Sequence, residues 1–132
     1  MNYAIFEKQD HDIYYVKFSP EVPSGQEFEI YLQKMTDILY RNKSVYFIMD
    51  ASYAPYISSD LRKQQAKWIK KHKAQIAKNV LSTVYIIPNA IQRSILNAIY
   101  ILQKPASPYK IVSTYKYAFD HLLELKAKKN VA

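Results

Sequence analysis

The sequence predicts a single α/β domain over residues 1–132, with a mixed β-sheet of about five strands and four helices. Two continuous apolar runs, at residues 45–49 and 80–87, are typical of strands covered on both faces. Stretches with apolar residues at helical spacing separate them, and two short β-rich runs open the chain. The expected order is therefore ββαβαβαβα, and a chain of this length needs no second domain to bury a core.

The first part of the chain predicts a β-hairpin followed by a helix. Residues 3–8 and 13–18 are β-rich, and a polar connector of hairpin length joins them. Ser24 and Glu27 have the spacing of a capping box, and apolar residues then recur at helical intervals as far as Arg41. We therefore expect an antiparallel strand pair and a helix that packs on the sheet.

The middle of the chain predicts a central strand and a basic helix. The apolar run at 45–49 ends in Asp50 and is the best candidate for the centre of the sheet. A loop rich in Tyr and Pro follows, and Ser58, Ser59 and Asp60 are good caps for a helix over residues 61–78.

The last part predicts a strand, a helix, a short strand and a final helix. The run at 80–87 leads through a Pro-Asn pair into a helix that ends at Leu102. Residues 110–113 form the last strand, and Thr114 caps a helix with an apolar stripe. Since helices separate the later strands, their pairing should be parallel, with right-handed crossovers.

The composition excludes several classes of protein. The single glycine, Gly25, excludes a Gly-rich phosphate loop and hence nucleotide sites of that kind. The lack of cysteine excludes disulfides, thiolate nucleophiles and Cys-based zinc sites, and favours a reducing compartment, the cytoplasm. Neither a signal peptide nor a membrane anchor is evident. The net charge of +8 allows binding to nucleic acid, anionic lipid or acidic proteins without selecting one.

Four phrases between Ser44 and Leu123 resemble bacterial SpoIIAA-like proteins of the STAS (anti-sigma factor antagonist-like) family. They cover about two-thirds of the chain and read VYFIMDAS, SSDLRKQQAKWIKKHKAQIA, VYIIPNAIQRSILNAIYIL and IVSTYKYAFDHLL. The predicted element order is similar to the STAS fold as well. The resemblance implies a STAS domain that works as a regulatory or protein-interaction module.

The resemblance also implies a candidate phosphorylation site, because STAS regulators carry a switch serine where the helix after the central strand begins. Ser58 and Ser59 occupy this place, with Ser59 as the candidate acceptor, but Ile57 and Asp60 replace the acidic residue and the glycine of the family pattern. A phosphate on Ser59 would be stabilised by the helix N-terminus and repelled by Asp60. The alternative is that these serines only cap the helix.

Two surfaces are candidate ligand or partner sites. One is the loop after the central strand, where ligands of α/β sheets lie; its candidates are Asp50, Ser52, Tyr53 and Tyr56, and the alternative is a turn in which Asp50 and Ser52 bond the backbone. The other is the basic face of the predicted helix 61–78, either a solvated face or a surface for nucleic acid or anionic lipid. Its members are Arg62, Lys63, Lys67, Lys70, Lys71, Lys73 and Lys78.

The helix over residues 90–102 is apolar on more than one side. The residues expected to face the core are Ile91, Ile95, Ala98, Ile99 and Leu102. A second apolar face would then lie outside this stripe and form a partner or self-association surface; its members are Leu96, Tyr100 and Ile101. The alternative is that the neighbouring basic helix or the KPASPY connector covers them.

Catalytic and metal-binding patterns are weak. The three histidines, His11, His72 and His121, lie on separate predicted elements, so we expect no metal site and no cofactor. His72 should be partly buried and hydrogen-bonded on its helix, and His121 solvated. No nucleophile elbow occurs.

The expected function is therefore a non-catalytic cytoplasmic interaction or regulatory module with an unidentified protein partner or a homodimer. The alternatives are a basic binder of nucleic acid or anionic membrane, and a SEC14-like protein that carries a small ligand or lipid in a pocket lined by some of the thirteen tyrosines.

Overall fold

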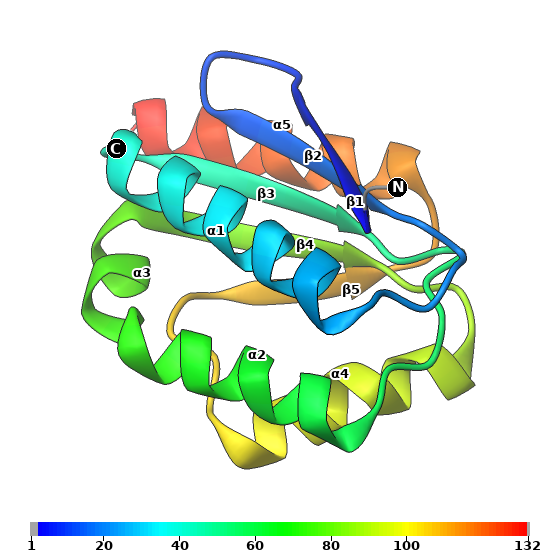
Figure 1. The fold of residues 1–132 in the computed structure, drawn as a ribbon. Coiled ribbons are helices and arrows are strands. Elements are labelled where there is room, and N and C mark those ends of the chain that lie inside the picture. Colours follow the sequence, from blue (N-terminus) through cyan, green and yellow to red (C-terminus); the bar gives the residue numbers. More distant parts are fainter. Residues whose placement is uncertain (1–2, 132) are drawn as a thin grey trace.

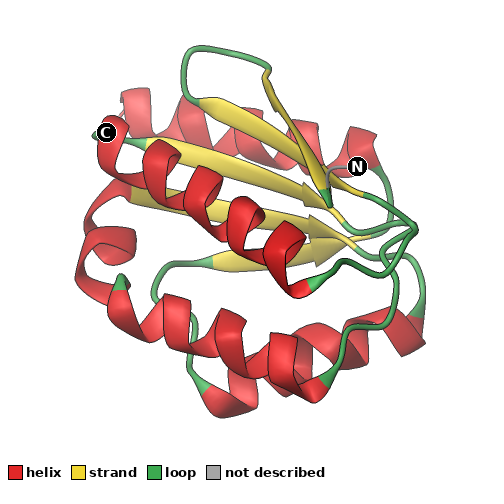
Figure 2. Ribbon diagram, in the orientation of Figure 1, coloured by secondary structure: helices red, strands yellow, loops and turns green. Residues whose placement is uncertain are grey.

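The computed structural model describes residues 3–131 and shows an α/β domain with a five-stranded mixed sheet and five helices (Figures 1 and 2). Residues 1, 2 and 132 of the predicted domain lie outside the described part. The elements are β1 (Ala4–Lys8), β2 (Ile13–Phe18), α1 (Gly25–Arg41), β3 (Val45–Asp50), α2 (Ser59–Lys71), α3 (Lys73–Asn79), β4 (Val80–Ile86), α4 (Ala90–Leu102), β5 (Tyr109–Val112) and α5 (Tyr115–Val131).

The strands lie in the sheet in the order in which they occur in the chain, β1-β2-β3-β4-β5. β1 pairs with β2 antiparallel, and all later pairs are parallel, so the predicted hairpin and parallel crossovers are confirmed. Each crossover steps to the next strand in the same direction, and right-handed crossovers of this kind place their helices on one face of the sheet. Figure 1 shows α1 to α4 on that side and α5 on the opposite face.

Two apolar clusters flank the sheet. β3 is buried along its whole length, as a central strand should be. One cluster joins its residues Val45, Phe47 and Met49 to α1, α2 and α4. The other joins Tyr46 and Ile48 to the inner face of α5. The sheet is therefore the middle layer of three.

Local hydrogen bonds explain where the helices begin. The capping box at α1 is complete, with Ser24 Oγ accepting from the Glu27 N–H at 3.1 Å and Glu27 Oε1 accepting from the Ser24 N–H at 3.0 Å. Asn89 caps α4 through the Ile91 N–H, and Thr114 Oγ1 accepts from the Tyr117 N–H at the start of α5. Each of these caps was predicted from the sequence.

The predicted helix 61–78 is two helices, so the expectation of four helices is wrong. His72 separates α2 from α3, with a backbone conformation (φ −104°, ψ 15°) outside the helical region. Its ring bonds the hydroxyl of Tyr40 on α1 at 2.9 Å and packs against the ring of Trp68. The bend turns α3 back toward α1. Sequence spacing hides the break because Ile69, His72 and Ile76 keep helical intervals across it.

α4 is rotated relative to the prediction. Its inward residues include Leu96 and Ile99, whereas Ile91 and Leu102 of the predicted core stripe are exposed. Ile99 alone of the predicted stripe is fully buried, and Ile95 is half-buried. The helix is apolar on nearly all sides, so spacing along the chain leaves its orientation undetermined.

Among the described residues, the helices are too short or too polar for any of them to cross a bilayer.

Candidate ligand cavity

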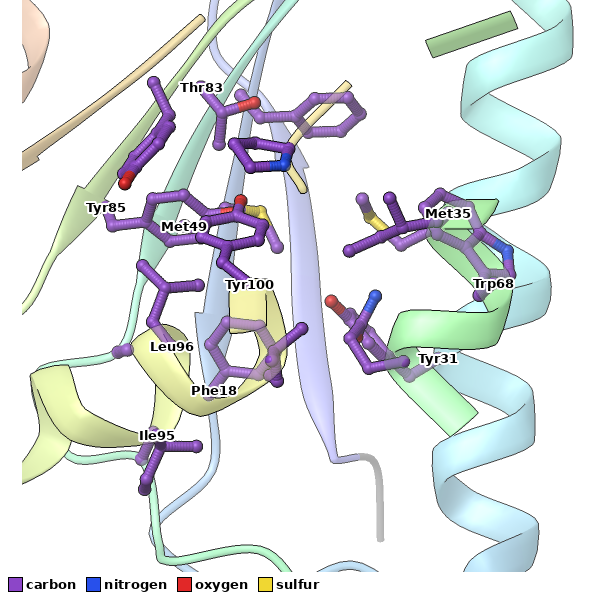
Figure 3. A pocket seen from close by; sticks show the side chains of 18 of the residues that line it. Phe18, Tyr31, Met35, Met49, Trp68, Thr83, Tyr85, Ile95, Leu96 and Tyr100 are labelled. Atoms are coloured by element: carbon purple, nitrogen blue, oxygen red, sulfur yellow. The ribbon is translucent and has the colours of Figure 1, made fainter. Parts of the chain in front are cut away.

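An apolar cavity of about 160 Å³ lies between the sheet and the helices α1, α2 and α4 (Figure 3). The sheet contributes side chains such as Phe47, Met49 and Tyr85 to its wall. The helices contribute Tyr31 from α1 and Trp68 from α2 on the facing side. The cavity is therefore lined by segments that lie far apart in the sequence.

The arrangement of the helices explains why space remains there. α2 packs on α4 and on α1. The α2–α4 pair lies away from the sheet rather than flat on it (Figure 1). From Ser82 onward, β4 alternates between buried residues on the α5 side and half-buried residues, Thr83 and Tyr85, on the cavity side. The expectation that strand 80–87 is fully covered on both faces is thus wrong at Thr83 and Tyr85, on the cavity side.

The wall of the cavity is aromatic and uncharged. Nine aromatic side chains contribute to it, and none of its residues is Asp, Glu, Lys, Arg or His. The aromatic members are Tyr3, Phe18, Phe28, Tyr31, Phe47, Trp68, Tyr85, Tyr100 and Tyr109. Apolar pockets with a few placed polar groups are the usual form of small-molecule sites.

Three tyrosine hydroxyls supply polar groups to this cavity. The hydroxyls of Tyr85 and Tyr100 bond each other at 2.6 Å. The Tyr31 hydroxyl points into the cavity from the opposite side (Figure 3). Burial raises the pKa of all three phenols far above the ordinary value of 10.0, so they are neutral hydrogen-bonding groups at any physiological pH.

Gln92 connects α4 to the loop after β3 at the rim of the cavity. Its side-chain amide donates to the carbonyls of Ser52, at 3.2 Å, and Ala54, at 3.1 Å. Its Oε1 is buried without a hydrogen-bond partner among the described residues. An acceptor left in this state is destabilising.

The predicted loop site divides into a structural part and an exposed part. Asp50 is 8% exposed and accepts hydrogen bonds from the Tyr15 hydroxyl and, at 2.5 and 3.0 Å, from the Ser52 hydroxyl and N–H. These contacts favour the alternative that Asp50 and Ser52 hold the turn. Tyr53 and Tyr56 are exposed and lie outside the cavity wall.

The structure places the predicted serines at the start of α2. Ser58 is the N-cap, and its Oγ accepts from the Leu61 N–H at 3.3 Å. Ser59 is the first residue of the helix and is exposed. The capping role of Ser58 is confirmed, while phosphorylation of Ser59 stays a prediction.

The basic face follows both α2 and α3 and bends with them at His72. Arg62 lies in the first turn of α2, where it donates to the Ile57 carbonyl at 2.6 Å and stacks over the Tyr56 ring. The six lysines of this face are exposed, and no ion pair involves them within residues 3–131. They are Lys63, Lys67, Lys70, Lys71, Lys73 and Lys78.

The predicted apolar surface on the 90–102 helix is largely internal. Leu96 is 8% exposed, and Tyr100 is half-buried with its hydroxyl on Tyr85; both line the cavity. The structure therefore favours the alternative that the basic helix and the KPASPY connector cover these two residues. Ile101 is 84% exposed, and its role as an interface residue stays a prediction.

The histidines lie apart from one another. His11 is in the β1–β2 turn, His72 is buried between α2 and α3, and His121 is half-buried on α5. The predicted hydrogen bond and partial burial of His72 are confirmed, whereas His121 is less solvated than expected. The described residues contain no group of three metal-ligating side chains.

The cavity is the feature that the sequence did not locate. Tyr31 and Trp68 read as ordinary members of apolar helix stripes, and the abundance of tyrosine was the one available signal. Comparison of the chain with family models, curated proteins and solved structures gives no match. The geometry of the cavity is therefore the main guide to function.

Proposed function

We propose that this domain binds a small apolar ligand in the aromatic cavity between the sheet and helices α1, α2 and α4. One observation carries the proposal: an uncharged wall with nine aromatic side chains surrounds about 160 Å³ beneath the α2–α4 pair. This favours the ligand carrier among the functions expected from the sequence.

The arrangement of the polar groups in and around the cavity supports the same function. The Tyr85 and Tyr100 hydroxyls bond each other inside the cavity, Tyr31 faces it from the opposite side, and Gln92 hydrogen-bonds the loop after β3 at the rim. The wall holds no carboxylate, imidazole or amine that could transfer a proton near neutral pH. We therefore propose binding without catalysis.

We also propose that the α/β architecture is of the STAS type, supported by the phrase-level resemblance between Ser44 and Leu123 and by the order of the elements. A regulatory role in this family would combine with ligand binding if occupancy of the cavity changed the position of α4, whose outer residues Ile91, Ile101 and Leu102 are exposed.

Native mass spectrometry and calorimetry test the ligand proposal. Protein purified without detergent should carry a bound small molecule, or should bind one of a panel of neutral organic probes with a dissociation constant on the order of 10–100 µM, as about eight ligand atoms at roughly 0.8 kcal/mol each would give. Ala106, in the connector before β5, lines the cavity, so Ala106→Phe should reduce binding at least tenfold.

Ala77→Phe is the matched control, because Ala77 is exposed on α3 and lies outside the cavity wall. It should bind like the unmodified protein. The proposed function would be refuted if the mass spectra show only the mass of the protein alone and calorimetry detects no binding of any probe in the panel. Equal binding by both Phe variants would place the ligand elsewhere.

A further inference from the structure

We infer that the cavity selects a neutral, single-ring molecule that carries one hydroxyl group, held by Tyr31. This inference deepens the proposed function and rests on it. Three observations support it independently: the volume of the cavity, the lack of charge in its wall, and a tyrosine hydroxyl that faces the space from α1.

The volume sets the size of the ligand. An engineered protein cavity of about 150 Å³ accommodates benzene, and the present cavity has about 160 Å³. A single ring with one or two small substituents therefore fits. A fused two-ring molecule or a long acyl chain exceeds this volume.

The wall sets the charge of the ligand. A carboxylate or ammonium group in this cavity would lose its hydration without meeting an opposite charge, since the wall has no ionised side chain. The buried phenols stay neutral as well, because burial raises their pKa. An acid of the right shape is thus excluded in its ionised form.

Tyr31 supplies the polar contact. It is 5% exposed as a whole residue, and its hydroxyl points into the cavity (Figure 3). The Tyr85 and Tyr100 hydroxyls already bond each other on the other side. A ligand hydroxyl can both donate and accept, so it satisfies Tyr31 in either orientation and leaves its ring among the aromatic side chains.

Calorimetry with three probes of one shape tests the inference: p-cresol, toluene and 4-methylbenzoate at neutral pH. We expect p-cresol to bind about fivefold to tenfold more tightly than toluene, the gain of one buried hydrogen bond, and 4-methylbenzoate not to bind measurably. Tyr31→Phe should bring p-cresol to within about twofold of toluene and leave toluene unchanged. Tyr117→Phe, at an exposed position on α5, is the control and should retain the preference.

The outcomes separate the two proposals. Toluene binding equal to p-cresol binding, a preference that survives Tyr31→Phe, or binding of the carboxylate overturns the hydroxyl selectivity and leaves the ligand function standing. If no probe binds and native mass spectrometry also finds no ligand, the proposed function itself fails. Circular dichroism of the Tyr31→Phe protein checks that its fold is intact.

Discussion

At the scale of single residues, His72 connects three helices. It ends α2, precedes α3 and bonds Tyr40 of α1 through Nδ1. Burial, with a smaller contribution from the charge of Lys71, lowers its pKa below the ordinary value of 6.5. The neutral imidazole is therefore the form that the folded protein favours.

This shift predicts a loss of stability in mild acid. Between the folded-state pKa and 6.5 the unfolded chain binds a proton that the folded chain does not, so the free energy of unfolding should fall as the pH drops from about 7.5 toward 5. Urea denaturation across this range measures it. His121, whose pKa is also lowered by burial, has the same sign, so His72→Gln and His121→Gln separate the two contributions.

A pH profile that is as steep in His72→Gln as in the unmodified protein would contradict this account of His72. The Asp10 carboxylate, whose pKa is lowered by its bonds to the His11 N–H and to Lys126, contributes only at more acidic pH. It therefore does not affect the comparison of the two histidine variants with the unmodified protein above pH 5.

The burial of His72 was predictable because it lies on an apolar stripe, and so was the turn-holding role of Asp50 and Ser52. The cavity role of Tyr31 was not. A tyrosine on a helix stripe has the same spacing whether its ring meets close packing or open space, and the difference arises from α2, α4 and the sheet together. The sequence pattern of one helix contains no information on such a gap.

At the scale of elements, α4 shows how an apolar helix acquires its orientation from its neighbours. Its cavity side carries Gln92, Ile95, Leu96, Ile99 and Tyr100. Its outer side carries Ile91, Ile101 and Leu102. Since both sides are apolar, the hydrogen bonds of Gln92 to the β3 loop and of Tyr100 to Tyr85 select between them.

This orientation predicts a contrast between two apolar truncations on one helix. Leu96→Ala should lower the free energy of unfolding by about 2–4 kcal/mol, because it removes buried methyl groups beside an existing cavity. Ile101→Ala should change it by less than about 0.5 kcal/mol, because the side chain is exposed. Chemical denaturation of the two variants measures the contrast, and the reverse ranking would show that α4 faces the other way.

At the scale of the whole molecule, the charge is concentrated away from the cavity wall. The net charge is +8, and the six exposed lysines of the basic face lie on α2 and α3, none of them in the cavity wall. Binding of a polyanion there stays a prediction, and it is compatible with a ligand inside.

A heparin column tests the basic face. Each Lys→Glu change lowers the net charge by two, so changing Lys63, Lys67, Lys70 and Lys71 brings the formal charge from +8 to zero. We expect this variant to elute at clearly lower salt than a control with the same net charge, because a local cluster binds phosphates or sulfates more strongly than dispersed lysines. The control changes Lys8, Lys17, Lys116 and Lys128, and equal elution of the two would exclude a localised site.

The architecture was the most predictable level. The apolar runs at 45–49 and 80–87 were sufficient to identify two adjacent strands, and right-handed crossovers then left few arrangements. What the sequence did not predict was how α2 and α4 would share one face of a narrow sheet with α1. Because three helices share this face, α2 and α4 lie apart from the strands, and the cavity remains between them and the sheet.

The strands lie in the sheet in the order in which they are synthesised, and this has a consequence for biosynthesis. Because every strand joins its immediate predecessor, a nascent chain can assemble the sheet and the α1 to α4 layer step by step while translation continues. The opposite face must wait for α5, and until the ribosome has released residues beyond Tyr115 it displays Tyr46, Ile48 and Val84 to water. Chaperone engagement should concentrate in that interval.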